Sequence, residues 1–305
     1  MKRFLVAALL AASAHASGDD IEWVTVGDPG NPPDKTGYGV VSYPFEISKF
    51  EVSVKQYVDF LNSVAANDPR QLWTAGSKIN RVGGPGAFRY EVQEGEANKP
   101  ITHISFPDAM RFANWWHNGR GKADTETGVY DIAKHGGLAQ KAEGAKVWIP
   151  SEDEWYKAAY YQPESKGGPA GGYWLYPTKS NEPPVFRELG VDPGNSARFE
   201  NFKVRDKIDG GAGKFIFFPC GTYPNSGSYY GTFDQGGNLW EWNAAIVFET
   251  KRVMRGGSGA HSVEKLRSTV RSNASPNKRY PDTGFRLARP VPVNVPDVSA
   301  AEVTK

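Results

Sequence analysis

The clearest periodic segment of the chain predicts an amphipathic helix that begins after Ser53. Its apolar positions follow the i, i+3, i+4, i+7 spacing of a single helical face: Tyr57, Phe60, Leu61 and Val64. Ser53, with Gln56 three residues later, matches a capping box, in which each side chain bonds the other residue's backbone N–H group. Asp68-Pro69 ends this segment. Residues 45–52 precede it, and their loose alternation predicts a strand.

Two further helices are predicted by the same combination of a capping serine and an apolar stripe. The second begins at Ser105, has Asp108 three residues later, and ends at Asn118-Gly119. Its buried stripe is expected to contain Ala109, Phe112, Ala113 and Trp116. The third begins at Ser151, and its first turn carries three carboxylates, which the helix dipole favours there. Its inward-facing residues are expected to be Trp155, Ala158 and Ala159.

The rest of the chain predicts short strands between long polar loops. Strands are expected at residues 147–150 and 240–242, and as a pair at 252–258 and 284–288. Residues 67–99 hold no sustained periodicity and 160–219 are rich in Gly and Pro, so both segments are predicted to be irregular. Few helices, short strands and no internal repeat or interdomain linker indicate an α+β domain and not a βαβ array.

The first residues predict export. Lys2 and Arg3 are basic, residues 4–12 (FLVAALLAA) are apolar, and small residues at 14 and 16 offer a cleavage site after Ala16. The apolar run is shorter than the about 20 residues that span a membrane, although a buried N-terminal helix is an alternative. We expect residues 1–16 to be a signal peptide, 17–290 the domain and 291–305 a C-terminal tail of a secreted or periplasmic protein.

Composition excludes several classes of protein. Lys and Arg total 36 against 34 Asp and Glu, which is too balanced for a protein that neutralises nucleic-acid phosphates. Loss of Lys2 and Arg3 with the signal peptide leaves 34 basic against 34 acidic residues. Cys220 is the single cysteine, so the chain forms no intrachain disulfide, multi-cysteine zinc site or cysteine-ligated iron–sulfur cluster. We therefore expect a near-neutral protein without nucleic-acid partners or a membrane span.

Five blocks, in order, carry a family likeness. They are residues 45–64 (FEISKFEVSVKQYVDFLNSV), 100–116 (PITHISFPDAMRFANWW), 149–159 (IPSEDEWYKAA), 230–242 (YGTFDQGGNLWEW) and 252–286 (RVMRGGS…LRSTVR…TGFR). Through them the chain resembles the formylglycine-generating enzyme (sulfatase-modifying factor) family over roughly residues 22–290. This resemblance implies an α+β domain with a C-type-lectin-like fold, few short helices and long loops.

The same resemblance indicates that the family's copper chemistry is missing here. The oxidases of the family bind copper through two cysteines spaced C-x4-C, just after a G-G-S element. Counted from Gly256-Gly257-Ser258, these positions hold His261 and Leu266, and Cys220 lies well upstream. Leucine neither binds metal nor carries out redox chemistry. We therefore do not expect conversion of a sulfatase cysteine to formylglycine by the family's mechanism.

His261 and Ser258 are the candidate catalytic residues. An imidazole at a copper-ligand position could hold iron, copper or zinc, and the alternative is a polar residue of the pocket wall. No H-x-E or H-x3-H partner accompanies His261, so the identity of any catalytic metal stays open. Ser258 matches a serine that lies near the active centre of the oxidases. The sequence does not place the other histidines beside His261: His103, His117 and His135.

Residues 234–241 form the candidate metal site, because the resemblance implies a structural calcium ion in this loop. Calcium prefers roughly six to eight hard oxygen ligands. Asp234 and Glu241 would supply carboxylates, and Gly237 and Leu239 would supply backbone carbonyls. The alternative is a glycine turn followed by a strand, with two tryptophans on one face and Glu241 on the other.

Three arginines recur in the family's R-x3-R and G-F-R elements: Arg267, Arg271 and Arg286. They predict either a site for an anionic ligand or ion pairs with helix-start carboxylates such as Glu154. Two functions therefore stay open. The first is an exported, divergent oxidase or tailoring enzyme that acts on a peptide or small molecule. The second is a noncatalytic, lectin-like binding module whose long loops recognise such a ligand.

Overall fold

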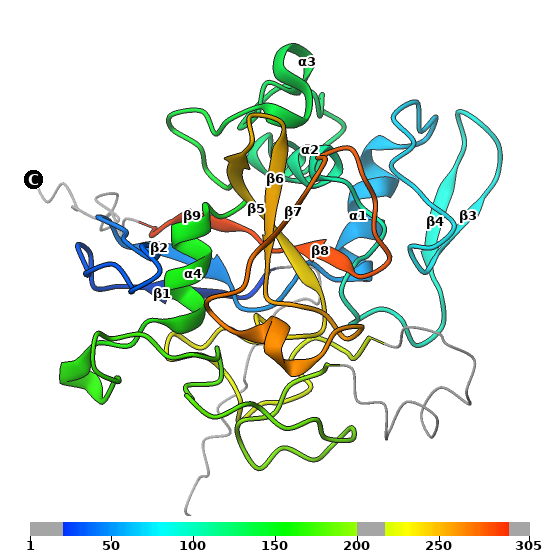
Figure 1. Ribbon diagram of the computed structural model, residues 1–305. Coiled ribbons are helices and arrows are strands. Elements are labelled where there is room, and N and C mark those ends of the chain that lie inside the picture. Colours follow the sequence, from blue (N-terminus) through cyan, green and yellow to red (C-terminus); the bar gives the residue numbers. More distant parts are fainter. Residues whose placement is uncertain (1–20, 200–216, 293–305) are drawn as a thin grey trace, which may run out of the picture.

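The computed structural model describes residues 21–199 and 217–292, and Figure 1 shows how their helices and strands are arranged. The expected signal peptide, its cleavage point after Ala16 and nearly all of the expected tail lie outside these ranges. Within them, no helix is long and apolar enough to cross a membrane.

The three predicted helices are confirmed, each with its capping box. They are α1 (Val54–Val64), α2 (Phe106–His117) and α4 (Glu152–Tyr160), capped by Ser53, Ser105 and Ser151. A capping box requires only residues three apart, so the sequence fixes these helix starts locally. The remaining short turns of helix are α3 (Ile132–His135), η1 (Gly136–Leu138), η2 (Glu164–Lys166) and η3 (Val263–Leu266).

The strands form three small sheets. The first contains β1 (Trp23–Val26), β2 (Phe45–Ser48) and β9 (Ala288–Pro290) in the order β1-β2-β9. The second is a hairpin of β3 (Ile79–Val82) and β4 (Arg89–Val92). The third has the order β7-β6-β5-β8, with strands β5 (Trp240–Val247), β6 (Lys251–Arg255), β7 (Ser272–Ala274) and β8 (Thr283–Phe285). Together with the few helices, they make the predicted α+β fold.

Several strand predictions need correction. Strands β6 and β8 do not pair with each other, because β5 lies between them and pairs antiparallel with β6 and parallel with β8. Residues 147–150 make only an isolated bridge, from Trp148 to Ala288. Residues 67–99, predicted to be irregular, contain the β3–β4 hairpin. In that hairpin a glycine-rich loop separates two four-residue strands, and only Ile79 and Tyr90 are buried.

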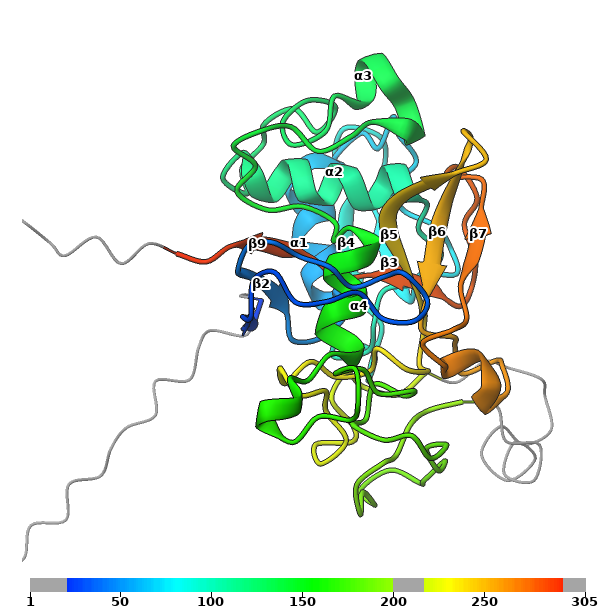
Figure 2. The same ribbon diagram turned by 60° about the vertical axis from the view of Figure 1, so that its left-hand side comes forward.

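Aromatic side chains connect the helices to the third sheet. Phe112 of α2 contacts Tyr57 and Phe60 of α1 and lies 5.4 Å from Phe285 of β8, centroid to centroid. In the stripe of α2, Trp115 is buried, while the predicted Trp116 is only half-buried. Helices α2 and α4 lie on the same side of this sheet (Figure 2). The core therefore lies between the helices and the sheet whose strands carry the candidate site residues.

Candidate functional site

The two predicted catalytic residues, Ser258 and His261, lie together after the end of β6. Ser258 Oγ lies 2.7 Å from His261 Nδ1 and 2.8 Å from Asp282 Oδ2, just before β8. The indole Nε1 of Trp240, the first residue of β5, lies 3.3 Å from His261 Nδ1. Strands β5, β6 and β8 therefore position this polar cluster. Its members Asp282 and Trp240 were not predicted as site residues.

The cluster does not have the geometry of a Ser-His-Asp hydrolase. In such a triad the serine and the aspartate contact opposite nitrogens of the imidazole. Here the hydroxyl and the carboxylate both lie on the Nδ1 side, with Asp282 Oδ2 3.7 Å from Nδ1. Ser258 is fully buried, so its hydroxyl is not available to attack a substrate. The hydroxyl instead donates to Asp282 and accepts from the imidazole Nδ1–H, which helps to fix the ring.

The contacts of His261 occupy Nδ1. The Ser258 hydroxyl has one proton and donates it to Asp282, so in the 2.7 Å contact with Ser258 Oγ the imidazole Nδ1–H is the donor. The Trp240 indole, at 3.3 Å from the same nitrogen, makes the weaker contact. A metal-ligand role of His261 would therefore fall to Nε2, and the side chain is 37% exposed.

Leu266 occupies the second copper-ligand position and lies in the interior of the protein. It is fully buried in a small apolar cluster with Tyr176 and Ala197. The hydroxyl of Tyr160 donates to its backbone carbonyl over 3.2 Å. Across residues 21–199 and 217–292, no group of three or more His, Cys, Asp or Glu side chains is placed to hold a metal ion. The side chains at the two cysteine positions therefore do not fit copper.

The other histidines and Cys220 are not grouped with His261 as metal ligands. His117 and His135 end α2 and α3. His103 lies within electrostatic range of Asp282, and burial together with Lys78 lowers its pKa. The thiol of Cys220 contacts the backbone carbonyl of Glu51, and burial raises its pKa well above the ordinary value. A protonated buried thiol is a poor nucleophile.

In the candidate calcium segment, Glu241 is held by a buried ion pair. Arg286 donates to its two carboxylate oxygens over 2.6 and 2.7 Å, and both side chains are fully buried. The Trp155 indole adds a third bond over 2.8 Å. The strand of the alternative is present, because β5 begins at Trp240 after the glycine turn, and Glu241 and Trp242 are both fully buried.

Asp234 and a residue that sequence reasoning missed, Glu51, add two more buried carboxylates. Asp234 accepts a bond from the Gly221 N–H over 2.6 Å. Glu51 bonds the Asn238 amide through Oε1, whereas its buried Oε2 has no partner. Burial, Asp234 and Glu241 all raise the pKa of Glu51, and burial raises that of Asp234 to about 6 although Arg286 opposes this.

The carboxylates around Arg286 carry excess negative charge. Three buried carboxylates interact with the single guanidinium of Arg286, and one carboxylate oxygen lacks the hydrogen bond that a buried polar atom requires. The turn also needs its glycine, because a Cβ on Gly237 would lie 2.1 Å from the Arg198 carbonyl oxygen. Both oxygens of Glu241 are already bonded to Arg286, and in the described residues no three such side chains are placed to hold a metal ion, so calcium binding by Asp234, Gly237, Leu239 and Glu241 stays a prediction.

The remaining family arginines form structural contacts. Arg271 makes a two-point ion pair with Glu152 in the first turn of α4, and Arg255 bonds the same carboxylate. The expected acid, Glu154, instead accepts from Trp148 and Tyr43. The general expectation of ion pairs at a helix start is therefore confirmed, but the partner named for it is wrong. Arg267 bonds the Tyr176 hydroxyl and pairs with neither acid.

Comparisons with known proteins agree with this fold. The model of the sulfatase-modifying factor enzyme 1-like domain matches residues 24–291. Hercynine oxygenase of Mycolicibacterium smegmatis is 24% identical over 82% of this chain and 54% of its own. Inactive C-alpha-formylglycine-generating enzyme 2 of Bos taurus is 25% identical over 67% of this chain and 54% of its own. The chain thus spans about half the length of these curated relatives.

Two solved structures share the fold. CarF superposes with a TM-score of 0.60 at 19% identity, over 90% of this chain and 100% of its own. PvdO from Pseudomonas aeruginosa superposes with a TM-score of 0.50 at 19% identity, over 90% of this chain and 96% of its own. At such identities these likenesses show the fold alone.

Proposed function

The chain belongs to the sulfatase-modifying factor enzyme 1-like family, and from that premise we propose that it is an exported binding module that does not make formylglycine. Its ligand would be a peptide or small molecule bound beside His261. The observation that carries this proposal is the replacement of both copper-ligand positions, one by an imidazole already engaged through Nδ1 and the other by a buried leucine.

The presence of Leu266 is evidence against a copper site with a changed ligand geometry. A rotamer change cannot bring a ligand to this position, because the side chain has no donor atom and is packed on all sides. A Cβ on Gly257 would already lie 3.0 Å from Leu266 Cδ1, so the G-G-S turn and this leucine are fitted to each other. The leucine at the second cysteine position therefore contributes to the packing of the G-G-S turn.

The exposed part of His261 suits recognition. With Nδ1–H bonded to Ser258, Nε2 of the neutral ring is a hydrogen-bond acceptor, and the ring packs edge-on against Trp240 with 5.6 Å between the centroids. A partly exposed acceptor beside an indole suits a ligand that combines an apolar part with a donor group. His261 lies in the loop between β6 and η3, and loops commonly carry the binding residues of a fold.

A second candidate is a tailoring enzyme that uses other chemistry. The Asp282 carboxylate, Ser258 hydroxyl and His261 imidazole lie in hydrogen-bonded series, an arrangement that can hold or pass a proton at Nδ1. Hercynine oxygenase among the relatives also favours catalysis. Ser258 is buried, and Ser258 and Asp282 both lie on the Nδ1 side of the His261 ring. This arrangement supports a role in positioning the imidazole more than a role in catalysis.

Metal analysis of untagged protein separates these candidates. We would measure copper, iron and calcium by mass spectrometry in the wild type and in His261→Ala, and then oxygen consumption with thiol and phenol substrates. The binding module predicts calcium at most and no oxygen uptake. Near-stoichiometric iron or copper that disappears in His261→Ala, together with oxygen uptake, would contradict it and support the tailoring enzyme.

A further inference from the structure

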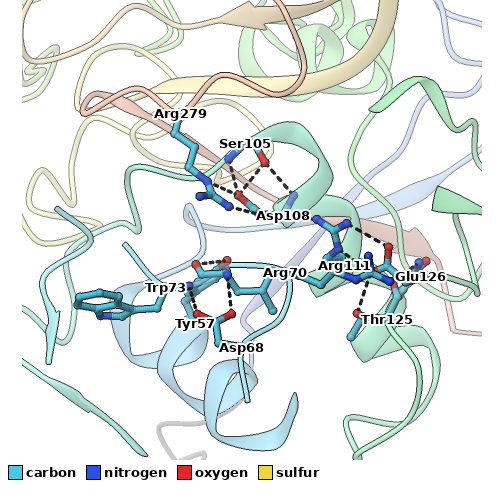
Figure 3. Close-up of polar contacts among 12 residues, drawn as sticks. Tyr57, Asp68, Arg70, Trp73, Ser105, Asp108, Arg111, Thr125, Glu126 and Arg279 are labelled. Atoms are coloured by element: carbon cyan, nitrogen blue, oxygen red, sulfur yellow. Dashed lines mark hydrogen bonds and ion pairs between the residues drawn. The ribbon is translucent and has the colours of Figure 1, made fainter. Parts of the chain in front are cut away.

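A second polar cavity lies away from His261, against the start of α2. Its volume is about 560 Å³, and α2, α3, the loop after α1 and the segment after β7 contribute its walls. Its charged lining residues are Arg70, Asp108, Arg111, Glu126 and Arg279, which Figure 3 shows pointing toward one another. None of these residues contributes to the function proposed above.

The first of its carboxylates, Asp108, has all its acceptor positions filled. Arg279 donates to both oxygens over 2.8 and 3.0 Å (Figure 3). Ser105 donates to Oδ2 through its backbone N–H and its hydroxyl, and Arg111 Nη1 lies 3.6 Å from Oδ1. The side chain is fully buried. A carboxylate satisfied in this way has no remaining need for an external cation.

Glu126 is occupied in the same manner. Arg111 makes a two-point contact with it over 2.7 and 3.0 Å. Arg70 Nε lies 3.5 Å from Oε1, and the Thr125 hydroxyl contacts the same atom over 3.3 Å. Both acids of the cavity are therefore neutralised by arginines from within the protein (Figure 3).

The arginines, in contrast, keep donors for a ligand. Each guanidinium has five N–H groups, and three guanidiniums against two carboxylates leave a net charge of +1 on the wall. Arg70 is 54% exposed and makes one long contact, so its ion pair contributes little to stability. Gln71 and Asn277 add side-chain amides to the lining.

We propose that this cavity is a binding site for a small anionic ligand whose carboxylate or phosphate group is held by Arg70 and the free N–H groups of Arg111 and Arg279. Planar guanidinium groups recognise both oxyanions through paired hydrogen bonds. Helix α2 contributes only its dipole, because Asp108 N already bonds the Ser105 hydroxyl and Phe106 N bonds a backbone carbonyl. Arg111 and Arg279 form the base of the site and Arg70 its adjustable rim.

Calorimetric titration of the whole chain tests this proposal, with inorganic phosphate and citrate as separate probes at low and high salt. We expect at least one probe to bind at a single site and to bind more weakly in high salt. Binding of phosphate alone or of citrate alone would identify which oxyanion the cavity takes. Absence of binding by both probes would overturn the proposal.

Arg70→Gln is the informative variant, because the exposed side chain can be changed without opening the buried network. It should weaken binding about tenfold or more, as expected for loss of a charged hydrogen bond. Arg89→Gln, on the exposed edge of β4, removes the same charge elsewhere and should leave binding unchanged. Equal effects of the two variants, or no effect of Arg70→Gln on a probe that binds, would overturn the assignment to this cavity.

Discussion

Asp234 gives a stability prediction with a defined pH range. Burial raises its pKa from 3.8 to about 6, while the Gly221 N–H and Arg286 oppose this and Glu241 adds to it. A rise of this size corresponds to about 3 kcal/mol of folding free energy. The folded-state pKa is above the unfolded value, so this stabilising contribution is complete below about pH 4 and is lost as the pH rises through about 6.

Asp234→Asn should therefore stabilise the calcium-free protein at neutral pH. The amide resembles the protonated acid in shape, can still accept from the Gly221 N–H, and removes a buried negative charge. Asp234 has a φ of 60°, and asparagine tolerates this left-handed conformation well. At pH 7 the variant should exceed the wild type by up to about 3 kcal/mol, and the advantage should disappear near pH 4.

Urea unfolding at a series of pH values, with EGTA present, measures this difference. The control is Asp59→Asn, a change to a partly exposed carboxylate, which should show no such pH dependence. Added calcium should stabilise the wild type and reduce the advantage of the variant, because the ion compensates the charge that the variant removes. A variant less stable than the wild type at pH 7 in EGTA, or a difference independent of pH, would contradict the raised pKa of Asp234.

Other variants test the core and the histidine cluster. Arg286→Met leaves Glu241 as an unpaired buried charge and should cost about 3–5 kcal/mol in urea unfolding, whereas Arg289→Met, on a partly exposed pair, should cost less than about 1 kcal/mol. Phe112→Ala should cost about 3–5 kcal/mol, and a loss below about 1 kcal/mol would contradict its place between α1 and β8. Ser258→Ala should shift the NMR resonances of the His261 ring, and unchanged resonances would contradict their contact.

The helix starts were predictable because their signals are local. Each capping serine bonds a residue three positions away, so neighbouring residues contain the information. The parallel pairing of β8 with β5 joins distant segments and leaves no periodic signal in a three-residue strand. The β3–β4 hairpin was missed because most of its side chains are exposed and its strands lack a clear alternation.

The candidate site was predictable only where neighbours in sequence are also neighbours in space. Ser258 and His261 are three residues apart and do contact each other. Asp282 reaches them from the start of another strand, and Glu51 reaches the Asp234 loop from the segment before α1. Nothing in the local pattern around either acid distinguishes it from a surface carboxylate. Their roles depend on burial, which tertiary packing determines.

Product analysis shows whether this member of the family makes formylglycine. The purified protein would be supplied with copper(I), oxygen and a peptide carrying a sulfatase-type cysteine, and the peptide mass would then be measured. We expect an unchanged peptide cysteine with wild-type protein. Conversion of that cysteine to formylglycine by the wild type, lost in His261→Ala, would show that the protein retains the family's chemistry.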